Sequence, residues 1–325
     1  MPDLIQAALR SHPTLTARQS EIRAAQAGVA SARWQYWPTP SVSMERSERA
    51  STAGSDRQVG VFSLKQPLWT AGRLDAGIAQ AQAAQAGSEA ALTEGQRDVA
   101  LEVVVAYGEA YAAQSRVAAY EQSLGVHERL LAQVQRRANE GLSAPSDVQL
   151  ANSRRGAVLA ERAYAAAQRD TARQRLQSLV GHAVSGDLGD PVLPVGLTTP
   201  GQTTVEAAMN QDPTLARLRT DIEQLEARAR QSQAALWPEV FARVDHRRAD
   251  ATGNTTQLFI GLESRWGAGL STAAATEATL HQVEAKHSEI DARQRKLGEQ
   301  ILSDQQLLDA AALCRFVWNA PASFR

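Results

Sequence analysis

The sequence predicts a mostly helical protein in which two β-hairpins lie between long helices. Three observations support this fold class. Apolar residues keep a seven-residue repeat from about Arg97 to Ala138, uncommon residues recur at one fixed separation, and alternating polar and apolar runs interrupt the helical stretches twice. Alanine dominates the apolar fraction, and aromatic residues make up only 5% of the chain. Such small side chains suit closely packed helices better than a thick globular core.

Length, charge and cysteine content exclude several classes of protein. The 325 residues suffice for two or three ordinary domains or for one elongated domain. A net charge of −1 gives no sign of a nucleic-acid partner. Cys314 is the one cysteine, so no disulfide can form within the chain. No run of about 18 apolar residues is present, so no transmembrane helix is expected.

The longest helix is expected where the seven-residue repeat runs. Its seam, in alternating steps of four and three, is Val99, Val103, Ala106, Ala110, Ala113, Val117, Tyr120, Leu124, His127, Leu131, Val134 and Ala138. Only the polar His127 interrupts it. A repeat of 3.5 residues keeps one seam against a partner helix and imposes a left-handed supercoil. At 1.5 Å per residue this helix spans roughly 60 Å, so it needs long partner helices.

The chain is expected to be a tandem duplication. Pro13 and Pro213 each begin a Pro-Thr-Leu, and Trp37-Pro38 returns as Trp237-Pro238 at the same separation. Helices over about 14–34 and 214–235 are expected to end at these Trp-Pro pairs, because proline disfavours helical geometry in the preceding residue. The first predicted repeat covers 1–181, with a β-hairpin over 40–69 and a long helical hairpin over 74–180. A linker over 182–202 leads to an incomplete second repeat over 203–312, with a β-hairpin over 239–266 and the start of a long helix. An atypical tail over 313–325 follows.

Each predicted β-hairpin contains two alternating runs, and a period of two with one apolar side indicates a strand. The strands approach the 9–11 residues that a tilted strand needs to cross a bilayer. The residues expected to face lipid are Val42, Met44, Phe62, Leu64, Val244, Ile260 and Leu262. Those expected to face the lumen of a barrel are Ser43, Glu45, Arg243, Asp245 and Glu263. Four strands cannot close a barrel, so several chains would have to combine their strands.

Tryptophan is concentrated at the ends of the predicted strands. The tryptophans that flank the hairpins are Trp34, Trp37, Trp69, Trp237 and Trp266. In a membrane these rings would form an aromatic belt at one interface, because both ends of each hairpin meet the helices on the same side. The alternative is a soluble hairpin with tryptophan in its core. The low aromatic content elsewhere favours the membrane interpretation.

The long helix is expected to reverse direction within 139–146 and to return from Asp147 as an antiparallel partner. Gly141 suits the left-handed position after a helix, and Ser146 or Asp147 can cap the returning helix. An exposed Leu142 at the apex exceeds what a simple reversal requires, which makes this tip a candidate for a contact with a partner. A hydrophobic contact between the two helix ends is the alternative.

Catalytic, cofactor and metal sites find little support in the sequence. The six histidines are scattered, and His281 and His287 lie on different faces of a helix, so a metal pair is not expected. Gly267-Ala268-Gly269 lacks the Gly-Lys-Ser/Thr that would follow in a phosphate-binding loop. No Ser/His/Asp set or pair of carboxylates has a recognisable spacing. We therefore expect no enzymatic activity, no cofactor and no metal.

Over about residues 3–312 the order of elements resembles that of the TolC family, the outer-membrane channel proteins of Gram-negative bacteria. Two motifs carry the resemblance besides that order. The first hairpin closes with QPLWTAGR over 66–73, and the helical tip reads EGLSAPSDVQLA over 140–151. Each motif is modest alone, and their duplicated order makes the match specific.

The resemblance implies a homotrimer with one twelve-stranded β-barrel in the outer membrane and an α-helical tunnel in the periplasm. The channel would be a passive exit duct for type I protein secretion or small-molecule efflux, and the two motifs favour secretion slightly. Its partners would be a periplasmic adaptor protein, an inner-membrane transporter and outer-membrane lipid, with no nucleic acid. By the same analogy the residues that dock the adaptor are Gly141, Leu142, Ser143, Ala144, Pro145 and Asp147.

Two features depart from the family pattern. Residues 1–10 lack the basic start and apolar centre of a leader peptide, and the second helical hairpin, whose tip would fall near position 341, is expected to be cut off. Gate residues in the family lie in that hairpin and have no counterpart here. Two alternatives follow: a soluble coiled-coil scaffold in the cytoplasm, or a truncated channel relative without transport function.

Overall fold

The structure is a computed structural model that describes residues 1–46, 58–191, 202–249, 253–264, 266–267 and 271–319, with the backbone alone over 202–205 and 308–319. It consists of two compact units, residues 1–17 with 93–197 and residues 18–92 with 198–325. The boundary between them falls within the helices α2 (Pro13–Trp34) and α3 (Arg73–Asn139). These units cut across the sequence repeats, so the division into repeats stays a prediction about the sequence.

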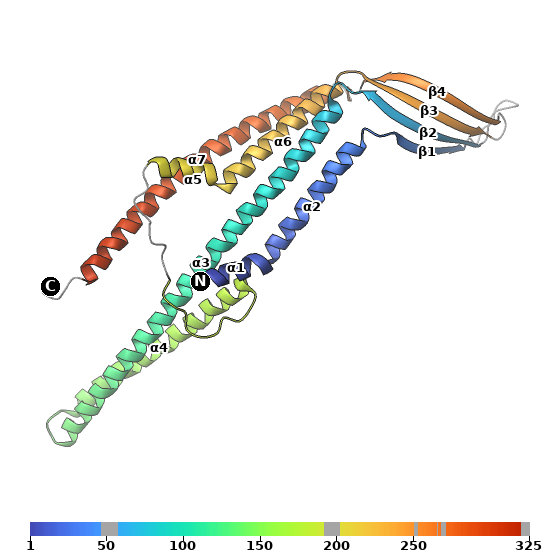
Figure 1. Cartoon of the computed structure of the whole chain (residues 1–325). Helices are drawn as coiled ribbons and strands as arrows, with labels where there is room; N and C mark the ends of the chain where they lie inside the picture. Colours follow the sequence, from blue (N-terminus) through green and yellow to red (C-terminus); the bar gives the residue numbers. More distant parts are fainter. Residues whose placement is uncertain (47–57, 192–201, 250–252, 265, 268–270, 320–325) are drawn as a thin grey trace. The chain divides into compact units, whose positions relative to one another are not determined.

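The first unit is built on an antiparallel helical hairpin of α3 and α4 (Pro145–Val180), as predicted (Figure 1). The seam of α3 faces inward: Val103, Ala106 and Ala110 have 0% exposed surface, and Val99 and Val117 are at most 5% exposed. Towards the tip the seam positions from Tyr120 to Ala138 are half-buried, His127 included. The seven-residue repeat therefore identified the packed face of the helix correctly.

Charged pairs join the two helices on the flanks of this seam. They are Glu109–Arg175 at 2.8 Å, Glu121–Arg162 at 2.7 Å and Glu128–Arg155 at 3.5 Å between nitrogen and oxygen. In each pair the two residues lie almost equally far from Leu142 along the chain, as an antiparallel hairpin with its apex there requires. Their side chains are about half exposed, so they fix the register of the helices more than they stabilise them.

The segment after α4 returns along α3 and is held by side chains of that helix. The hydroxyl of Tyr107 donates to the Gly189 carbonyl at 2.7 Å. The Gln114 amide both donates to the Leu188 carbonyl at 3.1 Å and accepts from the Leu188 N–H at 3.0 Å, so it acts as a backbone partner would in a strand. Leu188 is only 8% exposed, while most of the residues around it are exposed, so this side chain anchors the segment to the first unit.

The second unit contains a four-stranded antiparallel sheet in the order β1 (Thr39–Arg46), β2 (Gln58–Trp69), β3 (Glu239–Ala249) and β4 (Gly253–Glu263) (Figure 1). Both predicted β-hairpins are confirmed by the β1–β2 and β3–β4 pairing. The two hairpins are also joined, because β2 pairs with β3 over nearly its whole length. In the described chain β1 and β4 each have one paired edge and one open edge.

Helices of the second unit include α5 (Gln202–Gln211), α6 (Pro213–Ala235) and α7 (Ser271–Asn319), and α6 packs along α7. The opening helices expected over about 14–34 and 214–235 are confirmed as α2 and α6, and the structure adds a short helix before each of them, α1 (Pro2–Ser11) and α5, neither of which was predicted from the sequence. The residue before Pro213 has ψ 114° instead of a helical angle. This residue, Asp212, is 6% exposed, accepts from the Thr214 N–H at 3.3 Å and binds Arg293 of α7 at 2.8 Å.

The end of α7 differs from the prediction. The helical pattern was expected to stop after Ala312, but the helix continues to Asn319. Neither glycine nor proline occurs between Ala312 and Pro321, so nothing in the sequence forces an earlier end. Among the helices over the described residues, none combines the length and the apolar content needed to cross a membrane.

Candidate functional site

The strand register divides the sheet into two chemically different faces. Directly paired residues of an antiparallel sheet point to the same side. Val42 pairs with Phe62, Phe62 with His246 and Leu64 with Val244, so these side chains share one face. The face is continued by every second residue of each strand, and its apolar members are Val42, Met44, Phe62, Leu64, Val240, Ala242, Val244, Leu258, Ile260 and Leu262. We call this the apolar face.

All seven residues expected to contact lipid lie on the apolar face, and this chain leaves them uncovered. Met44 is 83% exposed, Ile260 76%, Val42 74% and Leu262 69%, while Phe62, Val244 and Leu64 are 36–47% exposed. A contiguous apolar surface of this kind is rare on a soluble monomer and marks contact with a partner or a membrane. These positions could be predicted because the alternation of apolar and polar residues is visible within each strand. That they contact lipid stays a prediction.

The opposite side, which we call the polar face, carries the five residues expected to line a lumen: Ser43, Glu45, Arg243, Asp245 and Glu263. Arg243 contacts the Asp245 carboxylate at 3.0 Å, and its guanidinium lies 5.0 Å from the centre of the Phe259 ring. These two charges therefore neutralise each other on the sheet itself. Whether the polar face lines a lumen stays a prediction.

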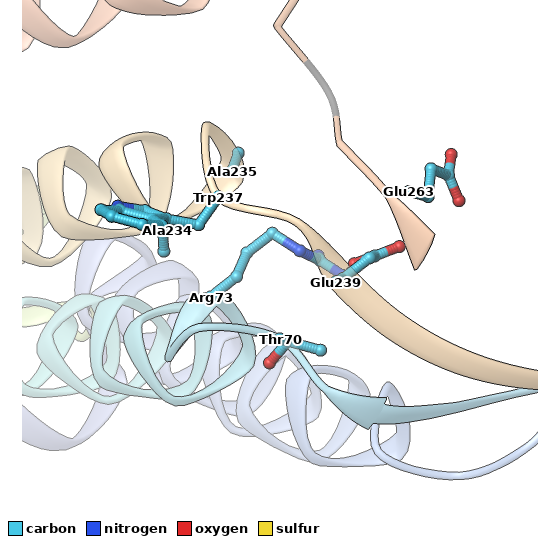
Figure 2. A pocket seen from close by; sticks show the side chains of 7 residues that line it. All are labelled: Thr70, Arg73, Ala234, Ala235, Trp237, Glu239 and Glu263. Atoms are coloured by element: carbon cyan, nitrogen blue, oxygen red, sulfur yellow. The ribbon is translucent and has the colours of Figure 1, made fainter. Parts of the chain in front are cut away.

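A series of linked ion pairs lies on the polar face at the end of the sheet where the strands meet the helices. Lys65 binds Glu263 at 2.5 Å and lies 3.7 Å from Glu239, which in turn binds Arg73 of α3 at 2.7 Å. Figure 2 shows the Arg73 side chain reaching Glu239, with Glu263 on the neighbouring strand. A cavity of about 10 Å³, room for roughly one water molecule, is lined by Arg73, Glu239 and Glu263 together with Thr70, Ala234, Ala235 and Trp237. Of the ion-paired group the site analysis of the sequence named only Glu263.

The sequence gives only a weak indication that Lys65, Glu239 and Arg73 belong to this group. Lys65 alternates with apolar neighbours, but nothing local shows that its partners lie on β3 and β4. Its ammonium also lies 3.9 Å from the centre of the Phe241 ring. That ring covers Gly261, where a Cβ would meet it at 2.4 Å, so the cross-strand pair needs glycine.

The five tryptophans expected to form a belt flank the helix-proximal ends of the strands. None lies in a core: Trp34 is 66% exposed, Trp237 65%, Trp37 62%, Trp266 58% and Trp69 53%. The indole N–H of Trp266 donates to the Leu236 carbonyl at 3.1 Å. In this chain the tryptophans therefore do not form a core of the hairpins. A role at a membrane interface stays a prediction.

Tyr36 fixes the connection between α2 and the sheet. Its hydroxyl donates to Asp75 of α3 at 2.6 Å, and its carbonyl accepts from the Gln66 amide at 2.9 Å. The hydrogen bond to Asp75 raises the pKa of Tyr36 to about 12, with burial and the carboxylate charge contributing less. Tyr36 therefore stays a neutral donor throughout the physiological pH range.

The tip between α3 and α4 has a well-defined backbone. Gly141 has φ +76°, its N–H donates to the Ala138 carbonyl at 3.0 Å, and the Leu142 N–H donates to the Arg137 carbonyl at 2.8 Å. These two bonds are the Schellman pattern that ends a helix at a left-handed residue, as Gly141 was expected to be. The Leu142 side chain is 73% exposed, so the alternative contact between helix ends does not bury it.

The start of α4 corrects the capping prediction. The helix begins at Pro145 rather than at Asp147, with Ala144 as the capping residue, because proline suits the first helical position. Asp147 contributes from inside the first turn, where its carboxylate accepts the Ala144 N–H at 3.2 Å. The tip residues Gly141, Ala144 and Pro145 are exposed and Ser143 is half-buried. Docking of an adaptor at this tip stays a prediction.

The histidines of the described ranges do not form a further candidate functional site. His281 pairs with Glu284 at 3.1 Å on an exposed turn of α7, and His246 shares a hydrogen bond with Thr256 at 2.9 Å. Over the described ranges no group of three or more histidine, cysteine, aspartate or glutamate side chains has a metal-binding arrangement. The sheet and the tip thus remain the two candidate functional surfaces.

Comparison with solved structures supports this architecture. A membrane protein from Pseudomonas aeruginosa is similar with a TM-score of 0.78 at 20% identity, over 97% of this chain and 76% of that one. The outer membrane protein VceC from Vibrio cholerae matches with 0.74 at 16% identity, over 96% and 78%. The open state of the Neisseria gonorrhoeae MtrE outer membrane channel matches with 0.73 at 15% identity, over 98% and 74%. At these identities the likeness shows the fold.

Sequence comparison identifies the family. No curated protein sequence matches the chain. The family model described as outer membrane efflux protein matches residues 4–182, which is more than half of the chain. The match includes β1, β2 and the whole α3–α4 hairpin with its tip, and therefore both motifs that carry the resemblance to TolC-like channels. The chain therefore belongs to the outer membrane efflux protein family.

Proposed function

We propose that the chain is a subunit of a homotrimeric outer-membrane channel that provides a passive exit duct. The two-faced sheet with its open edges carries this proposal. Four strands cannot close a barrel, and an open edge is not tolerated in lipid because its N–H and C=O groups would lack partners. Three copies that pair β1 of one with β4 of the next would give twelve strands. The apolar face would then contact lipid, and the polar face would line the lumen.

The aromatic belt supports the same orientation. Exposed tryptophans with one polar group are favoured where a bilayer meets water. In this chain they lie at the helix-proximal ends of the strands, so the helices would begin at the periplasmic surface. The α3–α4 hairpins of the three copies would then form part of a periplasmic tunnel, in which α3 keeps its buried seam towards α4.

The tip supports the proposed partners. Leu142 is held on a rigid turn and is 73% exposed, as an apolar side chain that enters a pocket of another protein would be. We infer that Gly141, Leu142 and the residues up to Asp147 dock a periplasmic adaptor, and that an inner-membrane transporter supplies the energy. The duplicated order of elements in 1–181 and 203–312 would place two related hairpins in each subunit.

The class of cargo follows the family description. Membership in an efflux family favours small molecules over secreted proteins, although the QPLWTAGR and APSDVQLA segments resemble the secretion branch. Several charges of the polar face are paired within the chain, among them Lys65 with Glu263 and Arg243 with Asp245, so the lumen would select little by charge. A transport assay that compares a small-molecule dye with an unfolded polypeptide distinguishes the two cargo classes.

A matched pair of variants tests the membrane role of the sheet. Leu64 and Ser63 are neighbours on β2 that point to opposite faces. We expect Leu64→Asp to abolish insertion of the full chain into phosphatidylcholine vesicles, because a charge on the lipid side of a barrel is costly at mid-depth. Ser63→Asp should insert as well as the unaltered chain. Equal insertion of the two variants would contradict the assignment of faces.

A further inference from the structure

Charge is distributed unequally between the two faces of the sheet. Every carboxylate of the described strands lies on the polar face: Glu45, Glu239, Asp245 and Glu263. On the apolar face the charged side chains are those of Arg46 and Arg248, with His246 beside them. The apolar face is therefore purely basic wherever it is charged, and the membrane role proposed above does not by itself require this.

The two arginines lie at the end of the sheet that is distant from the helices. Arg46 is the last residue of β1 and pairs with Gln58, and Arg248 on β3 pairs with Gly60 and with Asn254. Both arginines are exposed. Strands lie about 4.8 Å apart, so the two Cα atoms are separated by roughly 12 Å along the diagonal. We call Arg46, Gln58, His246, Arg248 and Asn254 the basic rim.

Gly60 leaves an opening in the middle of the basic rim. A Cβ at this position would meet only the Arg248 carbonyl oxygen, at 4.0 Å, so the surface directly above Gly60 is free of side-chain atoms. Gln58 lies beside Gly60 on the same face of β2 and Asn254 lies beside Arg248 on β4, so their amides add further donors to the rim. Neither guanidinium makes an ion pair or hydrogen bond within the described part of the chain. Among the described strand residues the rim thus presents donors for an anion and no competing carboxylate.

We propose that the basic rim binds the phosphate groups of lipid A, the phosphorylated glycolipid of the outer leaflet. This inference rests on the proposed function, because the leaflet is assigned by taking the helix-distal end of the sheet as the outer end. The planar guanidinium forms two parallel hydrogen bonds to a phosphate, which suits arginine better than lysine for this contact. Two arginines about 12 Å apart fit a headgroup with two phosphates better than one with a single phosphate.

The neighbouring residue provides a matched control. Arg247 is adjacent to Arg248 in sequence, has the same charge and is also exposed, but it points to the polar face. A nonspecific effect of removing positive charge would be the same for both residues. An effect that requires contact with lipid headgroups is confined to the rim.

The test uses the full chain reconstituted in three kinds of vesicle: phosphatidylcholine alone, phosphatidylcholine with about one tenth lipid A, and phosphatidylcholine with phosphatidylglycerol at equal charge. Insertion is measured in the neutral vesicles by protease protection. Retention of anionic lipid by the protein is measured by mass spectrometry after detergent extraction. The variants are Arg46→Gln with Arg248→Gln, Arg247→Gln, and Arg46→Lys with Arg248→Lys.

We expect each rim arginine to contribute about fivefold to lipid A retention, so the double glutamine variant should lose roughly 25-fold. Arg247→Gln should retain lipid A as the unaltered chain does, and the double lysine variant, which keeps the charge but not the paired hydrogen bonds, should recover only part of the loss. Equal retention by the double glutamine variant, equal loss in Arg247→Gln, or equal retention of phosphatidylglycerol would overturn the proposal. Failure of the unaltered chain to insert into neutral vesicles would instead refute the proposed function, and the rim would lose its role with it.

Discussion

The helical hairpin of α3 and α4 and the four-stranded sheet each carry a periodic apolar face, but one face is buried and the other is exposed. In the hairpin the apolar seam is buried inside one chain, and Val103 has no exposed surface. In the sheet the apolar face is left open, with Met44 83% exposed. The ion pairs show the reverse contrast, because Glu121–Arg162 of the hairpin is solvated while Glu239 of the sheet is 8% exposed next to Arg73 and Lys65. The hairpin is complete within the chain, and the sheet needs a surrounding that the chain does not supply.

The largest effect expected from this contrast concerns one apolar position in each region. Val103→Asp would bury a charge without a partner, so the free energy of unfolding of the first unit should fall by more than about 4 kcal/mol. Leu64→Asp places the same charge on a face that this chain leaves exposed and should cost less than about 1 kcal/mol in aqueous solution without detergent. Chemical denaturation followed by circular dichroism measures both. A similar loss of unfolding free energy in the two variants would contradict the distinction between a buried seam in the hairpin and an exposed apolar face on the sheet.

The ion pairs of the sheet come next. Glu239→Gln leaves Arg73 without its carboxylate partner in a largely buried place, which should cost about 3 kcal/mol. Glu263→Gln removes a carboxylate that is 41% exposed and should cost less than half as much. Thermal unfolding of the two variants in the same detergent gives the comparison. If Glu263→Gln lowers the unfolding temperature more than Glu239→Gln does, the pair of Lys65 with Glu263 contributes more to stability than the pair of Arg73 with Glu239.

Two glycines of the hairpin should respond with opposite signs. Gly141 has φ +76°, so Gly141→Ala should lower the free energy of unfolding by about 1 kcal/mol. Gly156 lies within α4, where an added Cβ would have no neighbouring atom within 4 Å, so Gly156→Ala should raise it by about the same amount. Denaturant midpoints of both variants test this. Stabilisation by Gly141→Ala would mean that the tip adopts another backbone in solution.

The smallest effect should come from the charged pairs on the flanks of the hairpin. A double-mutant cycle on Glu121 and Arg162 should give a coupling energy of about 0.5 kcal/mol, since both side chains are about half exposed. The coupling should shrink when salt is raised from about 0.05 M to 0.5 M, because exposed charges are screened. A coupling above about 2 kcal/mol would show that this pair stabilises the hairpin rather than fixing its register.

The sequence was most informative where the physical cause is local. The seam of α3, the alternation of the strands and the glycine of the tip each follow from a period or a backbone angle, and the structure places Val103, Leu64 and Gly141 accordingly. The family followed from the order of such elements. The start of α6 at Pro213 is equally local, because proline disfavours helical geometry in the residue before it, and it agrees with the helix expected from about 214.

What could not be predicted depends on contacts between distant segments. Nothing near Lys65 indicates that it lies between Glu239 and Glu263, because the pairing of β2 with β3 brings these residues together. The same pairing places Arg46 and Arg248 at one end of one face. The end of α7 was mispredicted for a different reason: a weak helical pattern without glycine or proline leaves the boundary undetermined until Asn319.

The heptad spacing of Glu121 and Glu128 against Arg162 and Arg155 has a consequence for how such a hairpin can change in length. Removing or adding seven residues in both helices would keep every seam position and every charged pair in phase. A change of any other size would rotate the buried face away from its partner. At 1.5 Å per residue each permitted step alters the reach of the tip by about 10 Å, so evolution can adjust this length only in discrete increments.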